Sequence, residues 1–529
     1  MHPVLLIDEI LRIVLDNIDS DSNRSSALKT FYRIATVCRA WKDPALDYLW
    51  ASLASVDPLL ALLPGHVSEH PQYLIDMSDG PMLQDVSTHE PLPSNPLALF
   101  HAYASRVRNV GPNSYSLPKL CPCIVDATTS ASTLLPSLRS VRLVLKDAAS
   151  QQFPPTLYLS RNLQSISVDV GFRSSKESLL GQHEALRAYL DAAARNASHL
   201  IHLRLRGHLP DRVINSVASM RNLRSFYLCG GSHLMPRTLV SIAGLPNLEY
   251  LRVQLDCINI ADMVEALDSA NSNTALFPTL RNLRVRASPA AAEALFAHFP
   301  SGKLRTLYLE SDLKPRSVDS WIPALAVLAE RTHTSLTDLS FEVLTSFCEA
   351  FAFPPKLHLT LATLTPLARL THLRRFVLDT SVPPDLCDTD LASVACWWPE
   401  IEELSLWSHP VEVFDFPAYF TTQPRATPAS LVTFATQCSR LRRLGLPMDV
   451  AVLPPPAHPP QAVPSHPTLV HLTIGCVRMG KTIDPAGVAE CIYRAFPALD
   501  EIEFDCGDDT SWTDVLERYS ALAPRILLA

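Results

Sequence analysis

The sequence predicts an α/β protein in which a small all-helical module precedes a long solenoid of parallel strands and helices. Three observations lead to this prediction. Apolar residues make up 47% of the chain and charged residues 19%, so there is enough apolar material for an extended core. The first 50 residues place apolar side chains at helical spacing. The remainder repeats one leucine motif about every 30 residues, which is typical of stacked repeats.

Composition limits where the protein acts and what it binds. The formal net charge of −8 disfavours a general binder of nucleic acid or of an anionic membrane. The twelve cysteines are scattered without a Cys-x-x-Cys pair, which indicates reduced thiols. Asp8, Glu9 and Arg12 interrupt the first apolar run, which is therefore unlike a signal peptide, and no stretch approaches the roughly 20 apolar residues of a membrane span. We expect a soluble intracellular protein, cytoplasmic and/or nuclear.

The N-terminal module, residues 1–50, is expected to contain three short helices. The first spans residues 6–18, and the second begins at Ser25 or Ser26 and continues to Ala40. The third covers residues 45–50 behind Pro44, because proline suits a first helical turn. The expected apolar stripe of the first helix is Leu6, Ile10, Ile13, Val14 and Ile18. So thin a core would be stabilised by a partner.

Three blocks of this module carry a resemblance to a known family. They read Leu6-Ile7-Asp8-Glu9-Ile10-Leu11, then Val37-Cys38-Arg39-Ala40-Trp41, and then Ala45-Leu46-Asp47-Tyr48-Leu49-Trp50. The segment resembles an F-box, although Ile7 stands where that family usually has proline. The resemblance implies docking on a Skp-type adaptor that links the chain to a cullin–RING ubiquitin ligase. The residues expected to bind the adaptor are Leu6, Ile7, Ile10, Leu11, Val37, Cys38, Trp41 and Trp50.

The repeats dominate the rest of the chain. Residues 51–105 form a partly helical bridge, with a helix expected near 96–106, and the solenoid covers residues 106–529. Thirteen copies of Leu-x-x-Leu-x-Leu, with apolar substitutes, begin at residues 138, 163, 200, 223, 248, 280, 304, 336, 373, 401, 441, 469 and 499. Amphipathic helices are expected between them, the clearest at 183–197, 211–220, 260–270, 289–299, 317–331 and 485–496.

One strand–helix unit cannot bury its own strand, so neighbouring units must stack. Right-handed crossovers then place parallel strands on one side and helices on the other. The array resembles the leucine-rich-repeat horseshoe, in the irregular form that often follows an F-box, with strands on its concave side and helices on its convex side. Residues 454–467 are rich in proline and replace one expected helix, which predicts an extended surface insertion.

Few motifs in the sequence indicate catalysis, nucleotide binding or metal binding. Residues 475–482 fit the phosphate-loop pattern G-x-x-x-x-G-K-[ST] and follow a strand. That loop needs a helix beginning at its Lys-Thr, whereas Asp484 and Pro485 place the helix start later. His199 and His202 flank a strand and do not share a helix face, so a zinc role is disfavoured. We expect no enzymatic activity, no cofactor and no metal site.

Substrate binding is expected on the strand face that points away from the core, because side chains alternate along a strand. In copies three to seven this face carries a basic stripe with interleaved tyrosines: His202, Arg204, Arg206, Tyr227, Tyr250, Arg252, Arg284, Arg286 and Tyr308. From copy eight onward it becomes acidic, with Asp338, Glu342, Asp379, Glu403, Glu501, Glu503 and Asp505. The basic half would favour an acidic or phosphorylated segment, although solubilising surface arginine remains an alternative.

The function that these patterns predict is the substrate-recognition subunit of an SCF-type cullin–RING ubiquitin ligase. The F-box would bind a Skp-type adaptor and the repeats would bind a substrate protein, with neither nucleic acid nor membrane as a partner. One alternative is a leucine-rich-repeat interaction scaffold that is not attached to a cullin complex. Another is a nucleotide hydrolase built on Lys481.

Overall fold

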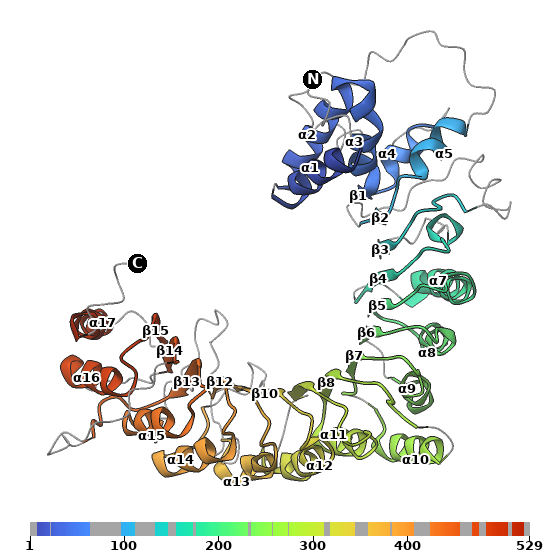
Figure 1. The fold of residues 1–529 in the computed structure, drawn as a ribbon. Coiled ribbons are helices and arrows are strands. Elements are labelled where there is room, and N and C mark those ends of the chain that lie inside the picture. Colours follow the sequence, from blue (N-terminus) through green and yellow to red (C-terminus); the bar gives the residue numbers. More distant parts are fainter. Residues whose placement is uncertain are drawn as a thin grey trace. The chain divides into compact units, whose positions relative to one another are not determined.

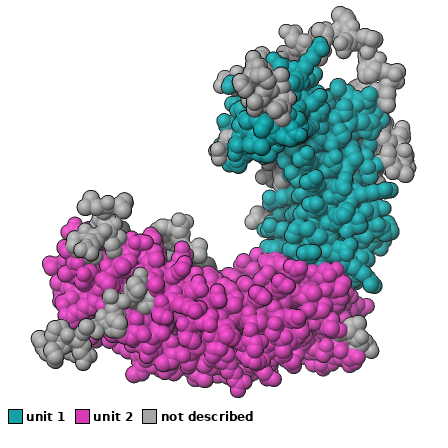
Figure 2. All heavy atoms as spheres, in the orientation of Figure 1, with its two compact units in different colours: residues 1–232 teal, residues 233–529 magenta. Residues whose placement is uncertain are grey.

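The computed structural model describes residues 8–21, 23–63, 97–111, 133–145, 155–172, 176–230, 234–256, 258–272, 275–311, 318–343, 358–380, 383–406, 424–454, 468–475, 483–505 and 510–522. The chain divides into two compact units, residues 1–232 and residues 233–529, which Figure 2 shows in different colours. Both units contain parallel strands, and the first also contains the helical module.

The helical module is a bundle of three helices, α1 (Asp8–Asp21), α2 (Arg24–Val37) and α3 (Arg39–Ala51), shown in Figure 1. Its core consists of Leu11, Leu15, Ala27 and Phe31, each at most 2% exposed. Five partly exposed residues pack against this core: Ile18, Ile34, Trp41, Tyr48 and Leu49. A core of four fully buried side chains is small, as the sequence led us to expect.

The boundary between the second and third helices was predicted wrongly. α2 ends at Val37, and Cys38 has an extended backbone with φ −161° and ψ 165°. α3 then begins at Arg39, and the Lys42 N–H donates to the Cys38 carbonyl over 3.1 Å. Pro44 therefore lies inside α3 and does not open it. A proline in the second turn removes one helical hydrogen bond but does not end this helix, whereas the extended backbone at Cys38 separates the two helices.

The first unit continues as an alternation of short strands and helices. Its further elements are β1 (Ser52–Leu53), α4 (Asp57–Leu60), α5 (Ala98–Ala104), β2 (Asn109–Val110), β3 (Ser140–Val144), the 3-10 helix η4 (Pro155–Tyr158), β4 (Ser165–Gly171), α7 (Lys176–Asn196), β5 (His202–Gly207), α8 (Asp211–Ile214), η5 (Asn215–Ser219) and β6 (Ser225–Gly230). Strands β1 to β6 pair in parallel and in chain order. The sheet thus begins at Ser52, inside the segment that the sequence suggested as a bridge.

The second unit repeats the same alternation. Its elements are α9 (Pro236–Ala243), β7 (Tyr250–Gln254), α10 (Ile260–Asn271), β8 (Asn282–Ala287), α11 (Pro289–Ala297), β9 (Thr306–Ser311), η6 (Val318–Trp321), α12 (Ile322–Thr332), β10 (Asp338–Val343), α13 (Leu361–Leu364), η9 (Thr365–Arg369), β11 (Arg375–Thr380), α14 (Asp388–Trp397), β12 (Glu403–Ser405), α15 (Ala429–Gln437), β13 (Arg443–Pro447), β14 (His471–Gly475), α16 (Pro485–Ala495), β15 (Glu501–Asp505) and α17 (Thr510–Leu522). Strands β7 to β15 also pair in parallel and in chain order.

The leucine motif determines the strand register in both units. Leu307 lies opposite Leu339, and Leu339 lies opposite Phe376, so equivalent motif positions are neighbours. The motif residues of the first twelve copies are at most 4% exposed. Within each unit the helices that connect successive strands from β3 onward lie on one side of those strands, as Figure 1 shows. The fold is therefore the leucine-rich-repeat solenoid that the sequence predicts.

Prolines mark the starts of several helices, as expected. Pro236, Pro289 and Pro485 are the first residues of α9, α11 and α16, and Pro210 and Pro428 immediately precede α8 and α15. The first N–H groups of a helix have no intrahelical partner, so a residue without an N–H loses nothing there. The expected helices at 211–220 and 317–331 each combine a 3-10 turn with an α-helical segment.

Hydroxyl side chains join successive repeats at the turns before the strands. The Thr279 hydroxyl donates to the Leu248 carbonyl over 3.1 Å, and the Ser335 hydroxyl donates to the Leu304 carbonyl over 2.7 Å. These bonds satisfy carbonyls at the ends of buried segments and tie each repeat to the one before it.

Two further predictions concern membrane spans and the proline-rich insertion. Within the described ranges, the helices are all too short or too polar to cross a lipid bilayer. The predicted proline-rich insertion lies outside the described residues except for Pro454.

Candidate binding surfaces

The predicted adaptor-binding residues that the structure describes differ in their exposure. Leu6 and Ile7 lie outside the described residues. Leu11 is 2% exposed and belongs to the core of the helical module. Trp50 packs against Tyr103 of α5, with ring centroids 4.6 Å apart. Leu11 and Trp50 therefore stabilise the first unit, because their apolar surfaces face residues of the same chain.

The other predicted adaptor residues are more accessible. Ile10, Cys38 and Trp41 are half-buried, and Trp41 packs against the bundle core. Val37, the last residue of α2, is 57% exposed. Their role in adaptor binding stays a prediction, with Val37 as the side chain that offers most surface.

Two residues of the predicted apolar stripe of α1 are exposed, and two apolar residues outside that stripe are buried. Ile13 and Val14 are 56% and 41% exposed, while Leu11 and Leu15 are buried. α1 is apolar around more than one face, so its sequence contains two overlapping stripes, and helical spacing does not say which stripe the bundle covers. Ile10, Ile13 and Val14 are spaced i, i+3, i+4 and share one side of α1. We call these three residues the α1 apolar face.

Ion pairs attach the helical module to the repeats that follow it. The carboxylate of Asp47 in α3 forms an ion pair with Arg12 of α1, with a nitrogen–oxygen distance of 3.2 Å. It forms a second ion pair with Arg106, which follows α5. Arg106 contacts Asp43 as well, at 2.7 Å. Arg106 and Asp47 are both less than 30% exposed, so this network is more shielded from solvent than an ordinary surface pair.

Tyr48 of α3 fixes the orientation of α1. Its hydroxyl donates to the Asp16 carboxylate over 2.6 Å and lies 3.2 Å from the Arg12 carbonyl. Burial, with a smaller contribution from the bond to Asp16, raises the pKa of Tyr48 to about 12. The Tyr48 hydroxyl thus ties α3 to α1 through Asp16 and the Arg12 carbonyl.

The basic stripe begins in the first unit with His202, Arg204 and Arg206 on β5 and Tyr227 on β6. Arg204 stacks over the Tyr227 ring, with its guanidinium carbon 4.3 Å from the centroid. Arg206 forms an ion pair of 2.7 Å with Asp169 of β4, and the hydrogen bond to Asp169 raises the pKa of Arg206. Asp169 was missing from the predicted site, although it occupies the equivalent strand position one repeat earlier.

The second unit carries the other residues of the predicted stripe on β7, β8 and β9. Arg252 lies opposite Arg284 in the strand register, and Arg284 lies opposite Tyr308. The Arg284 guanidinium carbon is 3.8 Å from the centre of the Tyr308 ring. Tyr250, the remaining aromatic residue of the prediction, is half-buried at the start of β7. Stacking on the Tyr308 ring holds the Arg284 guanidinium in place.

Arg286 differs from its neighbours because the chain supplies its counter-ions. It lies 3.0 Å from Asp256 and 3.4 Å from Glu310. Neither acid was part of the predicted site. The stripe is therefore less basic than its arginine count suggests, and Arg204 and Arg284, which stack on tyrosine rings, are better candidates for binding an acidic group than Arg286.

The acidic residues of the strand face begin at β10. Glu342 lies opposite Asp379 of β11. Burial and the neighbouring Asp379 raise the pKa of Glu342, and the more distant Arg284 partly opposes this shift. The acidic part is not uniform, because Glu403 pairs with Arg375 at 3.2 Å.

One group of side chains near the C-terminus has the composition of a metal site. His471, Glu501 and Glu503 each offer a ligand atom, and these atoms lie within 4.8 Å of one another. The two histidine nitrogens point at different carboxylates, Nδ1 at Glu501 over 3.0 Å and Nε2 at Glu503 over 3.3 Å. This arrangement suits hydrogen bonding of the imidazole between two acids, since one metal ion would take a single nitrogen from this ring.

The region of the phosphate-loop motif offers little to a nucleotide. Residues 476–482 lie outside the described residues, and Gly475 ends β14. α16 begins at Pro485, three residues after Thr482, and the Asp484 carboxylate accepts the Ala486 N–H over 3.1 Å. The first turn of this helix is thus already capped by an anion, which would repel a phosphate.

Comparisons with known proteins add little beyond the fold. No protein-family model and no curated protein matches the chain. Among solved structures, a leucine-rich-repeat protein of Leptospira interrogans aligns over 77% of this chain and 98% of its own, with 15% identity and a TM-score of 0.31. A structure of the Rad7 and Elc1 complex in yeast aligns over 88% of this chain and 98% of that chain, with 13% identity and a TM-score of 0.33. At such low scores, the fold assignment rests on the strand pairing and on motif burial.

Proposed function

We propose that the chain is the substrate-recognition subunit of an SCF-type cullin–RING ubiquitin ligase. The α1 apolar face and Val37 would bind a Skp-type adaptor, and the strand face of the repeats would bind a substrate protein. The chain would contribute no catalytic side chain. It would act by raising the effective concentration of the substrate beside the ubiquitin-transfer machinery.

The observation that supports this proposal most strongly is the apolar surface left on the helical module. Ile13, Val14 and Val37 are 56%, 41% and 57% exposed, on helices whose other large apolar residues are buried or half-buried. Apolar residues gathered on a small module favour a protein partner, because a partner removes them from water. The F-box-like sequence blocks occur in the same three helices, and that resemblance points to a Skp-type adaptor.

A capture experiment tests the adaptor interaction. The full chain is expected to co-purify with a co-expressed Skp-type adaptor, and Val14→Asp should weaken capture at least tenfold, because a charge would be buried in the interface. The matched control is Val470→Asp, at a residue of the second unit that is 43% exposed. Loss of capture in the control as well, or full capture by Val14→Asp, would contradict the proposed interface.

The substrate is proposed to be a protein with an acidic or phosphorylated segment. Arg204 and Arg284 stack on tyrosine rings, and Arg252 lies opposite Arg284 in the strand register, so this face presents positive charge that suits carboxylate or phosphate oxygens. Proximity labelling in cells with the proteasome inhibited would identify candidate substrates.

Charge reversal then tests the strand face. Replacing Arg204, Arg252 and Arg284 by Glu should abolish substrate capture while adaptor capture survives. The charge-matched control replaces Arg195, Lys303 and Arg369, three exposed cations outside the strand face. Unchanged capture by the first variant would end the substrate proposal. A chain that captures substrates but no adaptor would instead be the interaction scaffold without a cullin complex.

A further inference from the structure

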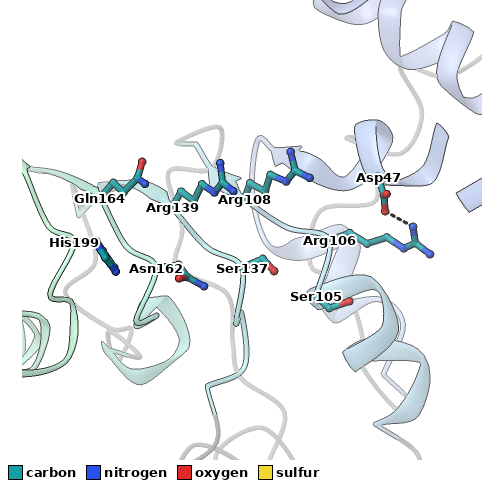
Figure 3. Close-up of a pocket in the computed structure, with 9 residues that line it drawn as sticks. All are labelled: Asp47, Ser105, Arg106, Arg108, Ser137, Arg139, Asn162, Gln164 and His199. Atoms are coloured by element: carbon teal, nitrogen blue, oxygen red, sulfur yellow. Dashed lines mark hydrogen bonds and ion pairs between the residues drawn. The ribbon is translucent and has the colours of Figure 1, made fainter. Parts of the chain in front are cut away.

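A polar cavity lies in the first unit, between the helical module and the turns that precede the first strands. Its volume is about 610 Å³, within the range of small-ligand sites. It is lined by Asp47, Ser105, Arg106, Arg108, Ser137, Arg139, Asn162, Gln164 and His199, which Figure 3 shows as sticks. None of these residues belongs to the predicted adaptor or substrate surfaces.

Repeat stacking explains why these residues meet. The Arg139 N–H donates to the Arg108 carbonyl, and the Gln164 N–H donates to the Arg139 carbonyl, each over 2.7 Å. Arg108, Arg139 and Gln164 therefore occupy the same position in successive repeats and form one row. The residues two positions earlier in each repeat form a second row, which consists of Arg106, Ser137, Asn162 and His199. Neighbouring members of a row are separated by roughly the 4.8 Å spacing of paired strands.

The charge of this cavity is positive and only partly compensated. Arg106 is neutralised by Asp43 and Asp47, and Asp47 is also held by Arg12. The guanidinium groups of Arg108 and Arg139 form no hydrogen bond or ion pair within the part of the chain that the structure describes. Figure 3 shows these two side chains next to each other, extending in the same direction from adjacent turns.

In two later repeats, arginines at the equivalent positions are paired with acidic side chains. In the second unit, Arg374 lies 3.8 Å from Glu402 and 3.9 Å from Glu400, and Arg440 lies 3.6 Å from Glu400. At Arg374 and Arg440 the chain therefore places acids next to its arginines. In the cavity, by contrast, the other members of the two rows are Arg106, two amides, one hydroxyl and an imidazole, which can donate hydrogen bonds to an anion.

We infer that this cavity is a binding site for a phosphate monoester group. Two adjacent guanidinium groups match the charge of a phosphate dianion, and their forked donors can each hold two of its oxygens. The amides and the hydroxyl of the two rows supply further donors for a group with three terminal oxygens, more than one carboxylate can accept. The inference does not depend on adaptor binding by the helical module.

Calorimetric titration of the full chain with free phosphoserine at constant ionic strength tests the inference, with serine as the unphosphorylated probe. The wild-type chain is expected to bind phosphoserine and not serine. Arg108→Gln combined with Arg139→Gln should weaken phosphoserine binding at least tenfold. Both arginines are exposed, so the unfolding temperature without ligand should be unchanged.

The matched control is Arg281→Gln combined with Arg305→Gln. These exposed arginines occupy the first row in two adjacent repeats of the second unit, where the Arg305 N–H donates to the Arg281 carbonyl over 2.8 Å, but they do not line this cavity. The control should bind phosphoserine as the wild type does. Absence of wild-type binding, or equal weakening in both double variants, would overturn the inference.

A second titration identifies the source of the phosphate. A short peptide containing phosphoserine is compared with free phosphoserine on the same protein. Tighter binding of the peptide, lost in the Arg108 and Arg139 double variant, would show that a protein presents the group. Equal affinities would show that the ester alone is recognised. Both results support the site, whereas binding of the peptide that survives the double variant would contradict it.

Discussion

The helical module and the repeats use their apolar side chains in opposite ways. In the repeats, the motif residues of twelve copies are at most 4% exposed. In the module, four side chains form the core, while Ile13, Val14 and Val37 keep about half of their surface in water. Stacking of neighbouring repeats buries their motif residues, whereas Ile13, Val14 and Val37 of the module stay exposed within the described residues.

This difference shows that equal apolar patterns need not have equal meaning. A leucine of the repeat motif stabilises the solenoid, so recognition by the repeats depends on the residues between the leucines, such as Arg204 and Arg284. An apolar residue of the module can serve a partner directly. The following changes test that division, beginning with the largest expected effect.

Truncation of a buried leucine in the repeats should destabilise the chain strongly. Truncation of an exposed apolar residue in the helical module should hardly change its stability. Leu307 of β9 is 1% exposed, so Leu307→Ala should lower the free energy of unfolding by about 3 kcal/mol through lost burial and a residual cavity. Ile13→Ala should change it by less than about 0.5 kcal/mol, because Ile13 is 56% exposed. Urea unfolding followed by circular dichroism measures both values. A comparable loss in Ile13→Ala would mean that the α1 apolar face is already covered.

A glycine at which the backbones of successive repeats approach closely should also resist substitution, although the expected loss of stability is smaller. Gly207 at the end of β5 has φ +112°, and a Cβ there would lie 2.7 Å from the Gly171 nitrogen. We expect Gly207→Ala to destabilise the chain by roughly 2 kcal/mol, from backbone strain and the clash. Gly244→Ala is the control, because its φ is −79° and its Cβ would lie 3.5 Å from the Val240 carbonyl. Equal unfolding midpoints for the two variants would refute this account of the contact.

The smallest expected effect concerns a buried histidine in the repeats. His183 of α7 is 7% exposed, and its Nε2 lies 2.9 Å from the His208 carbonyl. Burial lowers the pKa of His183 below 6.5, so the unfolded chain binds a proton more readily than the folded chain. The associated stability is present above pH 6.5 and is lost as the pH falls from 6.5 toward the lowered pKa.

His183→Gln isolates this contribution from the other histidines. Glutamine stays neutral and can still donate to the His208 carbonyl, so the variant should lose less stability than the wild type between pH 7 and pH 5. Thermal unfolding at intervals across that range measures the difference. Parallel pH profiles for the two proteins would show that His183 does not titrate differently on folding.

The sequence predicted the repeats better than the helical module, for a physical reason. A motif such as Leu304-x-x-Leu307-x-Leu309 recurs many times, and each copy must bury the same side chains against similar neighbours. Strand order, register and the sites of most helices follow from that repetition. The three-helix module has no repetition to constrain it, so helical spacing alone did not distinguish Leu11 and Leu15, which are buried, from Ile13 and Val14, which are exposed.

The candidate sites were predictable only in part, because a strand pattern shows which side chains share a face but not which are paired. Arg206 and Arg286 were assigned correctly to the strand face, yet Asp169, Asp256 and Glu310 neutralise them. The cavity beside Arg108 and Arg139 depends on turns of different repeats and on the end of α3. No local sequence motif indicates such a cavity. The equivalent positions that line it can be identified only when the strand register is known.

Hydrogen exchange of the full chain, measured with and without a Skp-type adaptor, tests the central claim most directly. The account predicts slower exchange in peptides covering residues 8–21 and 24–37 when the adaptor is added, and unchanged exchange in the strands of the second unit. Slower exchange confined to the repeats, or no change anywhere at saturating adaptor, would contradict the proposed division between the two regions.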